Sequence, residues 1–542
     1  MMFHMRSPRF AALCVLVGLL GFGWTCIGRE QLSPSPELVF RVWFEPTLRS
    51  EPASGRVVVY LIREGGLIGP QVNPAEGPFF LSPQPMFGVN VTDLRPGQFV
   101  TLDDSATSFP VEMSRLPRGK YRAQAVLDMH RDDSDWQREP GNLFSRPLTF
   151  TIAEGRPLPR VDLKLEAVTQ PRPPRETAGM AFVEVPSRLL SEFRGKEVKL
   201  RVGVIYPVNW DKSRQYAAIY EVPGFGGDDR AILHELRKRT GPEREDPRSE
   251  IWKHAFKIIL NPEGPNGHHL FTNSANNGPV ADALIQEVIP ALEQKFNLVP
   301  RAEARLLRGH SSGGWSVIWL AMNYPDVFGA AWSSSPDPVD FRRFQLSDIY
   351  AQESIYSGAP ASLLGNTATE LDGQTVSYRD QGVARMTVRD ENLMEEVIGP
   401  SNTSGQQWDS WFAVFGPRGA DGNPAALFDP ATGKIDRAVA EQYRKYDISW
   451  LLRSEPEKYG PIFKQRIRIV VGTEDDFFLN EAVELLRREI DALSFFDLPE
   501  GSLGYITFAP GCTHGTVVRN DIVLNFNSEM LEHLRKHNLL SY

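Results

Sequence analysis

The chain has 542 residues, a formal net charge of −9 and a hydrophobic fraction of 41%. At roughly 100 to 200 residues per domain this length predicts two or three domains, and we expect two. The acidic balance leaves no basic excess to neutralise phosphates, so composition argues against nucleic acid as a partner.

Residues 1–28 read as a signal peptide. Arg6 and Arg9 precede an apolar run from Phe10 to about Trp24, and small residues follow. This run is too short and ends too abruptly to be a good membrane span. We therefore expect a secreted or periplasmic protein with no membrane span after cleavage, and lipid attachment at Cys26 is the alternative.

Cysteine usage argues against a disulfide framework. Cys14 and Cys26 lie in or beside the signal peptide, so Cys512 would be alone in the mature chain. A cysteine-ligated metal site is excluded on the same ground. Asp and Asn residues are scattered over "DGNPAALFDPATG", but their spacing differs from that of an EF-hand loop. We expect no metal and no cofactor.

Residues 30–168 are strand-like throughout. Runs such as "LVFRVWFEP", "GRVVVYLI" and "YRAQAVLDMH" are separated by turn sequences such as "LRPGQ" and "LPRGK". Short β-branched and aromatic runs with this punctuation predict an all-β sandwich domain. The proline-rich stretch that follows, residues 169–179, reads as an extended linker.

Residues 180–542 follow a different pattern, in which strands and helices alternate. Strand-like "YAAIYEV", "ARLLRG" and "RIRIVVG" are interspersed with helical "DALIQEVIPALEQKF" and "LNEAVELLRREIDAL". Alternation predicts an α/β domain with a mostly parallel sheet covered by helices on both faces. The aperiodic interval from about 341 to 451 is interpreted as an insertion or cap over that sheet.

The stretch "RLLRGHSSGG" places Gly309, Ser311 and Gly313 in G-x-S-x-G register. It follows a short strand and precedes a helix, which is the context of a nucleophile elbow. Ser311 fits the nucleophile position. The neighbouring Ser312 does not, because His310 stands two residues before it where a glycine is needed.

A serine nucleophile needs an imidazole base and a carboxylate that orients the imidazole. The order Ser, acid, His is expected for this fold, and only three histidines follow all the candidate acids. We favour His514, in the loop "APGCTHGT", over His533 and His537 on a terminal helix. For the acid we rank Asp475 first, Asp337 second and Asp476 third; the first and third follow the strand "RIRIVVG".

Acyl transfer also needs two N–H groups directed at the oxyanion. Ser312 would supply one from its backbone, and the loop "YEVPGFGGDD" would supply the other, with Phe225 as the expected donor. His310, Asn276 and Asn277 are candidate substrate-binding residues. For the loop that contains the two asparagines, a simple chain turn is the alternative.

Together these motifs resemble the esterase family of α/β-hydrolases, which includes S-formylglutathione hydrolase, the enterochelin and feruloyl esterases and the mycolyltransferases. The resemblance rests on "VPGFGGDD", "GHSSGGWSVIWLAMNYPDVFGAAWSSSPDP", "GTEDDFFL" and "GCTHG". It covers roughly Phe182 to the C-terminus and implies an α/β-hydrolase fold with the roles named above. Pro223-Gly224 stands where family members commonly have His-Gly.

These observations predict a serine carboxylic-ester hydrolase that acts through Ser311, His514 and Asp475 on a small-molecule or polysaccharide-linked ester. Acyl transfer with the same triad is one alternative. A catalytically inactive hydrolase fold that binds glycan or a surface partner is another. Sequence does not separate hydrolysis from transfer, because the two differ only in which hydroxyl reaches the acyl-enzyme.

Overall fold

The computed structural model describes residues 38–171, 177–240, 245–365, 368–493 and 504–540. The expected signal peptide, including Cys14 and Cys26, lies outside these residues, and so do residues 172–176 of the expected linker. The described residues belong to one compact unit. None of the helices described in this unit has the length and apolar composition needed to cross a bilayer.

Nine strands of the N-terminal region join in one hydrogen-bonded sheet, in the order β4-β1-β9-β7-β6-β2-β3-β5, with β8 paired to β6. They are β1 (Val39–Phe44), β2 (Ala53–Arg63), β3 (Met86–Leu94), β4 (Val100–Leu102), β5 (Thr107–Phe109), β6 (Gly119–Asp128), β7 (Leu143–Ser145), β8 (Leu148–Ile152) and β9 (Arg160–Val168). No α-helix occurs within residues 38–171.

The inner face of these strands encloses a single apolar core. In β1 every second side chain is buried, namely Phe40, Val42 and Phe44, because alternate residues of a strand point to opposite faces. Side chains from all the strands except β5 meet in this core. Such enclosure by facing strands is typical of a sandwich.

Strand β2 is buried on both faces, which explains its continuous apolar run "VVVYLI". Val57 and Val59 face the inner core, whereas Val58 and Tyr60 pack in a second cluster with Met394 and other residues of the chain beyond position 385. The N-terminal region therefore packs against the region interpreted as an insertion.

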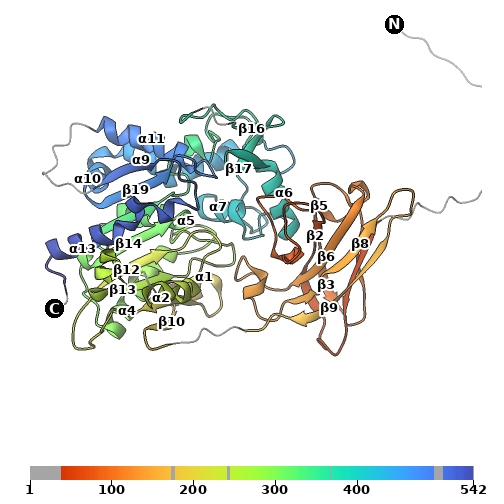
Figure 1. Ribbon diagram of the computed structural model, residues 1–542, viewed down its shortest axis with the longest axis horizontal. Helices are drawn as coiled ribbons and strands as arrows, with labels where there is room; N and C mark the ends of the chain where they lie inside the picture. Colours follow the sequence, from red (N-terminus) through yellow and green to blue (C-terminus); the bar gives the residue numbers. More distant parts are fainter. Residues whose placement is uncertain (1–37, 172–176, 241–244, 366–367, 494–503, 541–542) are drawn as a thin grey trace, which may run out of the picture. The chain divides into compact units, whose positions relative to one another are not determined.

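The second sheet has eight strands in the order β10-β11-β13-β12-β14-β15-β19-β20. They are β10 (Met180–Pro186), β11 (Lys199–Ile205), β12 (Ala217–Val222), β13 (Ala255–Leu260), β14 (Arg305–His310), β15 (Ala330–Ser334), β19 (Ile467–Gly472) and β20 (Tyr505–Ala509). Figure 1 labels β10, β13, β12, β14 and β19 of this sheet. β11 pairs antiparallel with β10 and β13, and the remaining neighbours are parallel. The carboxyl ends of the parallel strands therefore meet at one edge, where ligands bind in such sheets.

Helices cover both faces of this sheet. Successive residues of β14 separate the two layers, since Leu307 packs in the cluster that contains Trp315, and Leu306 packs in the cluster that contains Phe526. The helices outside the insertion are α1 (Arg188–Arg194), α2 (Ile232–Thr240), α3 (Val280–Ala283), α4 (Ile289–Phe296), α5 (Ser312–Asn323), α10 (Pro456–Arg466), α11 (Leu479–Ala492), α12 (Asp521–Leu524) and α13 (Phe526–Lys536). The predicted α/β class, with an all-β region before a mostly parallel sheet, is confirmed.

The long interval between β15 and β19 carries its own secondary structure. Its elements are β16 (Glu370–Leu371), β17 (Gln374–Asp380), β18 (Val383–Thr387), α6 (Val388–Ile398), α7 (Gln407–Phe415), α8 (Arg437–Tyr443) and α9 (Ile448–Ser454). Trp408 and Trp411 of α7 are only 0% and 2% exposed and belong to the main core. These indoles are core groups and not an exposed surface for stacking on a sugar.

Candidate active site

Ser311 lies at a sharp turn between β14 and α5. Its φ and ψ are 57° and −127°, a conformation that is costly for a residue with a Cβ and is found where function requires it. A Cβ on Gly309 would lie 2.1 Å from the Gly313 carbonyl oxygen, and one on Gly313 would lie 1.9 Å from the Val222 carbonyl oxygen. Both glycines of the motif are therefore required by close backbone approach, as a nucleophile elbow demands.

The two adjacent serines have different surroundings. Ser312 is fully buried, and its hydroxyl donates to Asp337 Oδ2 at 2.7 Å. Ser311 Oγ lies 3.5 Å from Asp337 Oδ1 and lines a cavity. The Ser312 hydroxyl is thus occupied inside the protein, whereas the Ser311 hydroxyl is accessible to a ligand.

His514 and Asp475 form a hydrogen-bonded pair, and His514 lines the same cavity as Ser311. His514 Nδ1 lies 3.0 Å from Asp475 Oδ2, and Asp475 is fully buried after the end of β19. The other oxygen of Asp475 accepts the Phe477 N–H at 3.0 Å, so the carboxylate is anchored on both sides. A bond at Nδ1 leaves the Nε2 of the imidazole for the serine.

The pair perturbs the acidity of both groups. Burial alone would raise the pKa of Asp475, but the charge of His514 and its hydrogen bond outweigh burial, so this pKa lies below its ordinary value. Burial would likewise lower the pKa of His514, but the Asp475 charge and hydrogen bond raise it above the ordinary value. Mutual stabilisation of imidazolium and carboxylate is what a serine hydrolase needs when the serine proton is transferred.

The two lower-ranked candidate acids, Asp337 and Asp476, make other contacts. Asp337 is fully buried below the serines, and the Trp411 indole donates to its Oδ2 at 2.8 Å. Asp476 accepts the backbone N–H of His514 at 3.2 Å. Neither makes the bond to the imidazole Nδ1 that Asp475 makes, so the geometry favours the first-ranked acid.

His310 lines the cavity but has a different environment from His514. Its Nδ1 lies 3.1 Å from the Ser334 hydroxyl, and its ring centroid is 4.6 Å from that of His514. Burial lowers the pKa of His310 to about 3. His310 is therefore neutral at ordinary pH and packs beside the candidate base.

The loop after β12, residues 223–228, lies directly against the nucleophile. A Cβ on Gly224 would be 3.0 Å from Ser311 Cβ, a tight contact, so glycine favours this close approach of the loop. Phe225 follows and lines the cavity. His268, which is fully buried, bonds to the Pro223 carbonyl at 3.0 Å through Nε2. Sequence reasoning did not assign His268 this contact.

We call the space next to Ser311 the nucleophile cavity; its volume is about 430 Å³. Besides the residues already named, it is lined by Phe80 from the N-terminal region and by polar and aromatic groups that the sequence did not single out for it, namely Gln345, Glu391, Gln407 and Phe477. Phe477 stands in the motif "GTEDDFFL" beside the candidate acids. The other residues come from segments without periodicity, and the sequence carries no signal that would bring them to this cavity.

Asn276 and Asn277, expected to bind substrate, are not among the residues that line the nucleophile cavity. The Asn276 amide donates to the carbonyls of Ala413 and Gly416 at 3.1 and 3.2 Å. The Asn277 Oδ1 accepts from Asn266 at 3.0 Å. Both side chains are buried and connect their loop to neighbouring segments, so the alternative of a structural turn fits this loop better.

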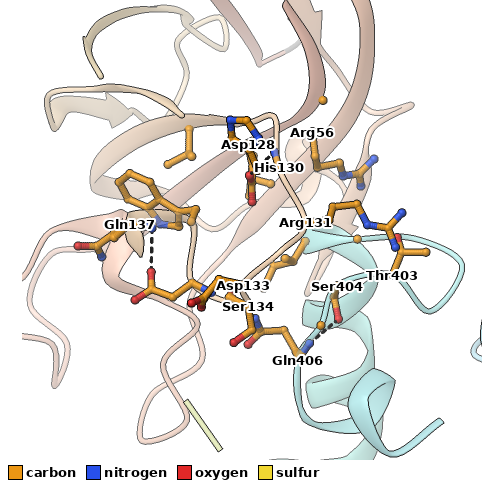
Figure 2. Close-up of a pocket in the computed structure, with 18 of the residues that line it drawn as sticks. Arg56, Asp128, His130, Arg131, Asp133, Ser134, Gln137, Thr403, Ser404 and Gln406 are labelled. Carbon is orange, nitrogen blue, oxygen red and sulfur yellow. Dashed lines mark hydrogen bonds between the residues drawn. The ribbon is translucent and has the colours of Figure 1, made fainter. Parts of the chain in front are cut away.

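A second cavity, of about 630 Å³, lies between the N-terminal region and the insertion. Figure 2 shows Arg56 on one side of it and Ser404 and Gln406 on the other. The Gln406 amide donates to the Ser134 carbonyl across the cavity at 3.0 Å. Phe225 lines both cavities, so its loop lies between them. Among the described residues no cluster of three or more His, Cys, Asp or Glu side chains is suited to hold a metal ion.

The strand order and the strained serine between strand and helix define an α/β-hydrolase. Residues 196–491 match the family described as "Putative esterase". This match covers more than half of the chain, so the protein belongs to that esterase family. It is a carboxylic-ester hydrolase.

Solved structures with a similar fold include a ferulic acid esterase, at 12% identity and a TM-score of 0.35, with 65% of this chain and 98% of that chain covered. An S-formylglutathione hydrolase from Staphylococcus aureus is 14% identical, with a TM-score of 0.33 and 65% and 99% covered. Est1E from Butyrivibrio proteoclasticus is 16% identical, with a TM-score of 0.34 and 66% and 100% covered. No curated protein matches the sequence.

Proposed function

We propose that the protein is an exported serine esterase in which Ser311 is the nucleophile, His514 the general base and Asp475 the residue that orients and stabilises the imidazole. One observation carries the proposal: the 3.0 Å bond between His514 and Asp475 lies at the cavity that the strained Ser311 also lines. Export rests on the signal-peptide pattern of residues 1–28.

The reaction would proceed through an acyl-enzyme. Ser311 Oγ attacks the ester carbonyl carbon while His514 Nε2 accepts the hydroxyl proton. Collapse of the tetrahedral intermediate breaks the ester C–O bond, and His514 returns the proton to the leaving alcohol. Water, deprotonated by His514, then attacks the acyl carbon, which releases the acid and restores the Ser311 hydroxyl.

The N–H groups of Phe225 and Ser312 would stabilise the oxyanion of each tetrahedral intermediate. Ser312 is the first residue of α5, where backbone N–H groups are free of helical partners and the helix dipole favours negative charge. Phe225 lies on the loop that Gly224 brings against Ser311. Two preorganised donors of this kind are usually the largest single contribution to ester catalysis.

The lining of the nucleophile cavity favours an uncharged ester. Among the residues that the structure describes, no lysine or arginine lines this cavity, whereas the carboxyls of Asp337 and Glu391 do. Burial raises the pKa of Glu391 to about 7, which reflects the cost of placing negative charge there. An ester that carries a carboxylate would add a further negative charge beside these carboxyls, and transfer of such a charge from water is costly.

Steady-state and rapid-mixing assays with aryl esters test the proposal. p-Nitrophenyl acetate should give a burst of nitrophenol equal to the enzyme concentration, followed by slower turnover, because an acyl-enzyme accumulates when deacylation limits the rate. The matched p-nitrophenyl hemisuccinate should react at least about 10-fold more slowly because of its carboxylate. The proposal would be contradicted if the protein hydrolysed neither p-nitrophenyl acetate nor any other neutral ester in a graded acyl series.

Activity is expected to rise with pH through a midpoint above the ordinary histidine pKa. His514 must be neutral to accept a proton, and Asp475 raises its pKa, so the enzyme is inactive below that midpoint and active above it. In Asp475→Asn the cause of the increase is removed while burial remains, and the midpoint should move to lower pH. The profile of kcat/KM from about pH 5 to about pH 9 measures both values; an unchanged midpoint in the variant would refute the assignment.

A further inference from the structure

Arg138 belongs to the N-terminal region, yet its guanidinium contacts the loop that carries Phe225. It ends the short 3₁₀ turn Trp136–Arg138. Its Nη2 donates to the Gly226 carbonyl at 2.8 Å, and its Nη1 lies 3.4 Å from Asp228 Oδ2. The Arg138 side chain is only 13% exposed, whereas its hydrogen bond to the Gly226 carbonyl lies at the exposed surface of the loop.

Carboxylates on the N-terminal side hold this guanidinium in place. Its Nε lies 3.2 Å from Asp135 Oδ2 and 3.5 Å from Asp133 Oδ1, and Figure 2 shows Asp133 at the wall of the second cavity. Burial would lower the pKa of Arg138, but the charges of Asp133, Glu263 and Asp228 outweigh it and raise the pKa. Because the guanidinium is rigid and planar, contacts on several sides fix its orientation.

The backbone that precedes Phe225 is held by hydrogen bonds from within the hydrolase region. The Pro223 carbonyl is bonded to the buried His268 at 3.0 Å. The Gly224 carbonyl accepts the Gly227 N–H at 3.0 Å, which closes a tight turn around Phe225. These two contacts fix where the turn begins and how it closes.

The Gly226 carbonyl, one residue after Phe225, is bonded from outside the hydrolase region. Gly226 adopts φ +74° and is exposed, and no atom lies within 4 Å of where a Cβ would be. The N–H of the peptide between Gly226 and Gly227 is bonded within the turn to the Gly224 carbonyl at 3.0 Å, and its carbonyl accepts the 2.8 Å bond from Arg138. This bond joins the N-terminal all-β region to the oxyanion loop of the hydrolase region.

We propose that Arg138 is a positioning residue for the oxyanion hole: by holding the Gly226 carbonyl it keeps the Phe225 N–H directed at the oxyanion. The inference rests on the proposed function, because it takes Phe225 as a donor to the intermediate. It gives the N-terminal all-β region a part in catalysis. Loss of one oxyanion donor typically costs about 10²- to 10³-fold in kcat, and a donor that is only loosened costs a fraction of that.

The test is Arg138→Lys, which keeps the charge among the carboxylates but replaces the planar fork by a single ammonium. We expect kcat for a neutral aryl ester to fall about 10-fold, with KM changed by less than about 3-fold, because the interaction matters only in the transition state. Arg56→Lys is the matched control. Arg56 also reaches from the N-terminal region into the insertion, where its Nε donates to the Val397 carbonyl at 3.0 Å, and its substitution should leave kcat within about 2-fold.

Binding of an alkyl boronic acid, which forms a tetrahedral adduct with the serine, separates positioning from general stability. Its affinity should fall about 10-fold in Arg138→Lys, whereas the affinity of the carboxylic-acid product should not change. An unchanged kcat in Arg138→Lys, or an equal loss in Arg56→Lys, would overturn the inference.

If Arg138→Lys does not fold, as judged by thermal unfolding, Asp135→Asn replaces it. Asp135→Asn removes the charge of a carboxylate that contacts Arg138 and is 37% exposed. We expect about 3-fold lower kcat in this variant. An unchanged kcat would overturn the inference.

A separate readout keeps this inference apart from the proposed function. Wild-type protein that hydrolyses esters and reacts with a fluorophosphonate, but shows full kcat after Arg138→Lys, would overturn only the role of Arg138. Wild-type protein that does neither would overturn the proposed function itself.

Discussion

Ser311→Ala is expected to lower kcat/KM for p-nitrophenyl acetate by about 10⁴- to 10⁶-fold, because the chain loses the oxygen that forms the acyl-enzyme. Folding should be unaffected, since the substitution removes only a hydroxyl that faces the cavity. The residual rate should show no burst. Progress curves for the variant and wild type at equal enzyme concentration measure both effects.

Ser316→Ala is the matched control for this prediction. Ser316 is a fully buried serine on the same helix, α5, and its hydroxyl donates to the Ser312 carbonyl at 2.8 Å. Its loss should cost about 1 kcal/mol of stability and leave hydrolysis within about 3-fold of wild type. Full activity in Ser311→Ala, together with its loss in Ser312→Ala, would show that the neighbouring serine is the nucleophile.

Asp475→Asn is expected to lower kcat by about 10²- to 10⁴-fold while KM changes little. The amide keeps the shape of the side chain but stabilises the wrong tautomer of His514 and removes the charge that favours the imidazolium. The structural basis is the 3.0 Å bond between the His514 Nδ1 and the fully buried Asp475 carboxylate. Steady-state kinetics on a neutral aryl ester measure the effect.

The two lower-ranked acids supply the comparison for Asp475. Asp476→Asn should reduce kcat by less than about 10-fold, because Asp476 bonds to the backbone N–H of His514 and not to its imidazole. Asp337→Asn should act mainly on stability, because Asp337 accepts hydrogen bonds from the Ser312 hydroxyl and the Trp411 indole. A larger loss of kcat in Asp337→Asn than in Asp475→Asn would reverse the ranking of the acids.

Local patterns predicted the sheet and the residues at its carboxyl edge. Strands and helices that alternate leave few topologies open, and the glycines around Ser311 mark one sharp turn. Asp475 and His514 follow the last strands of the sheet, so their meeting near Ser311 follows from the parallel arrangement. Ser311 and His514 line one cavity, Asp475 is bonded to His514 behind it, and catalysis by these three residues stays a prediction.

The walls of the cavity could not be predicted, because they depend on packing between distant segments. Phe80 comes from the all-β region, and Gln345, Glu391 and Gln407 come from the insertion. None of these residues stands in a motif or in a periodic run. The polar loop with Asn276 and Asn277 illustrates the opposite case: its composition suits a binding site, but its amides satisfy backbone and side-chain groups of neighbouring segments.

The role that we propose for the N-terminal region could not be predicted from the sequence either. Arg138 stands in a turn rich in charged residues, which ordinarily indicates a solvated loop. The positioning role that we propose for it depends on the contact with Gly226, which lies 88 residues further along the chain. Only the folded structure brings these two residues together.

The covalent site of a fluorophosphonate tests the central claim most directly. Wild-type protein is labelled to completion, digested and analysed by mass spectrometry, with Ser311→Ala treated in parallel. The account predicts one phosphonyl group on Ser311 in wild type and no label in the variant. A label on any other residue, or labelling that survives Ser311→Ala, would contradict it.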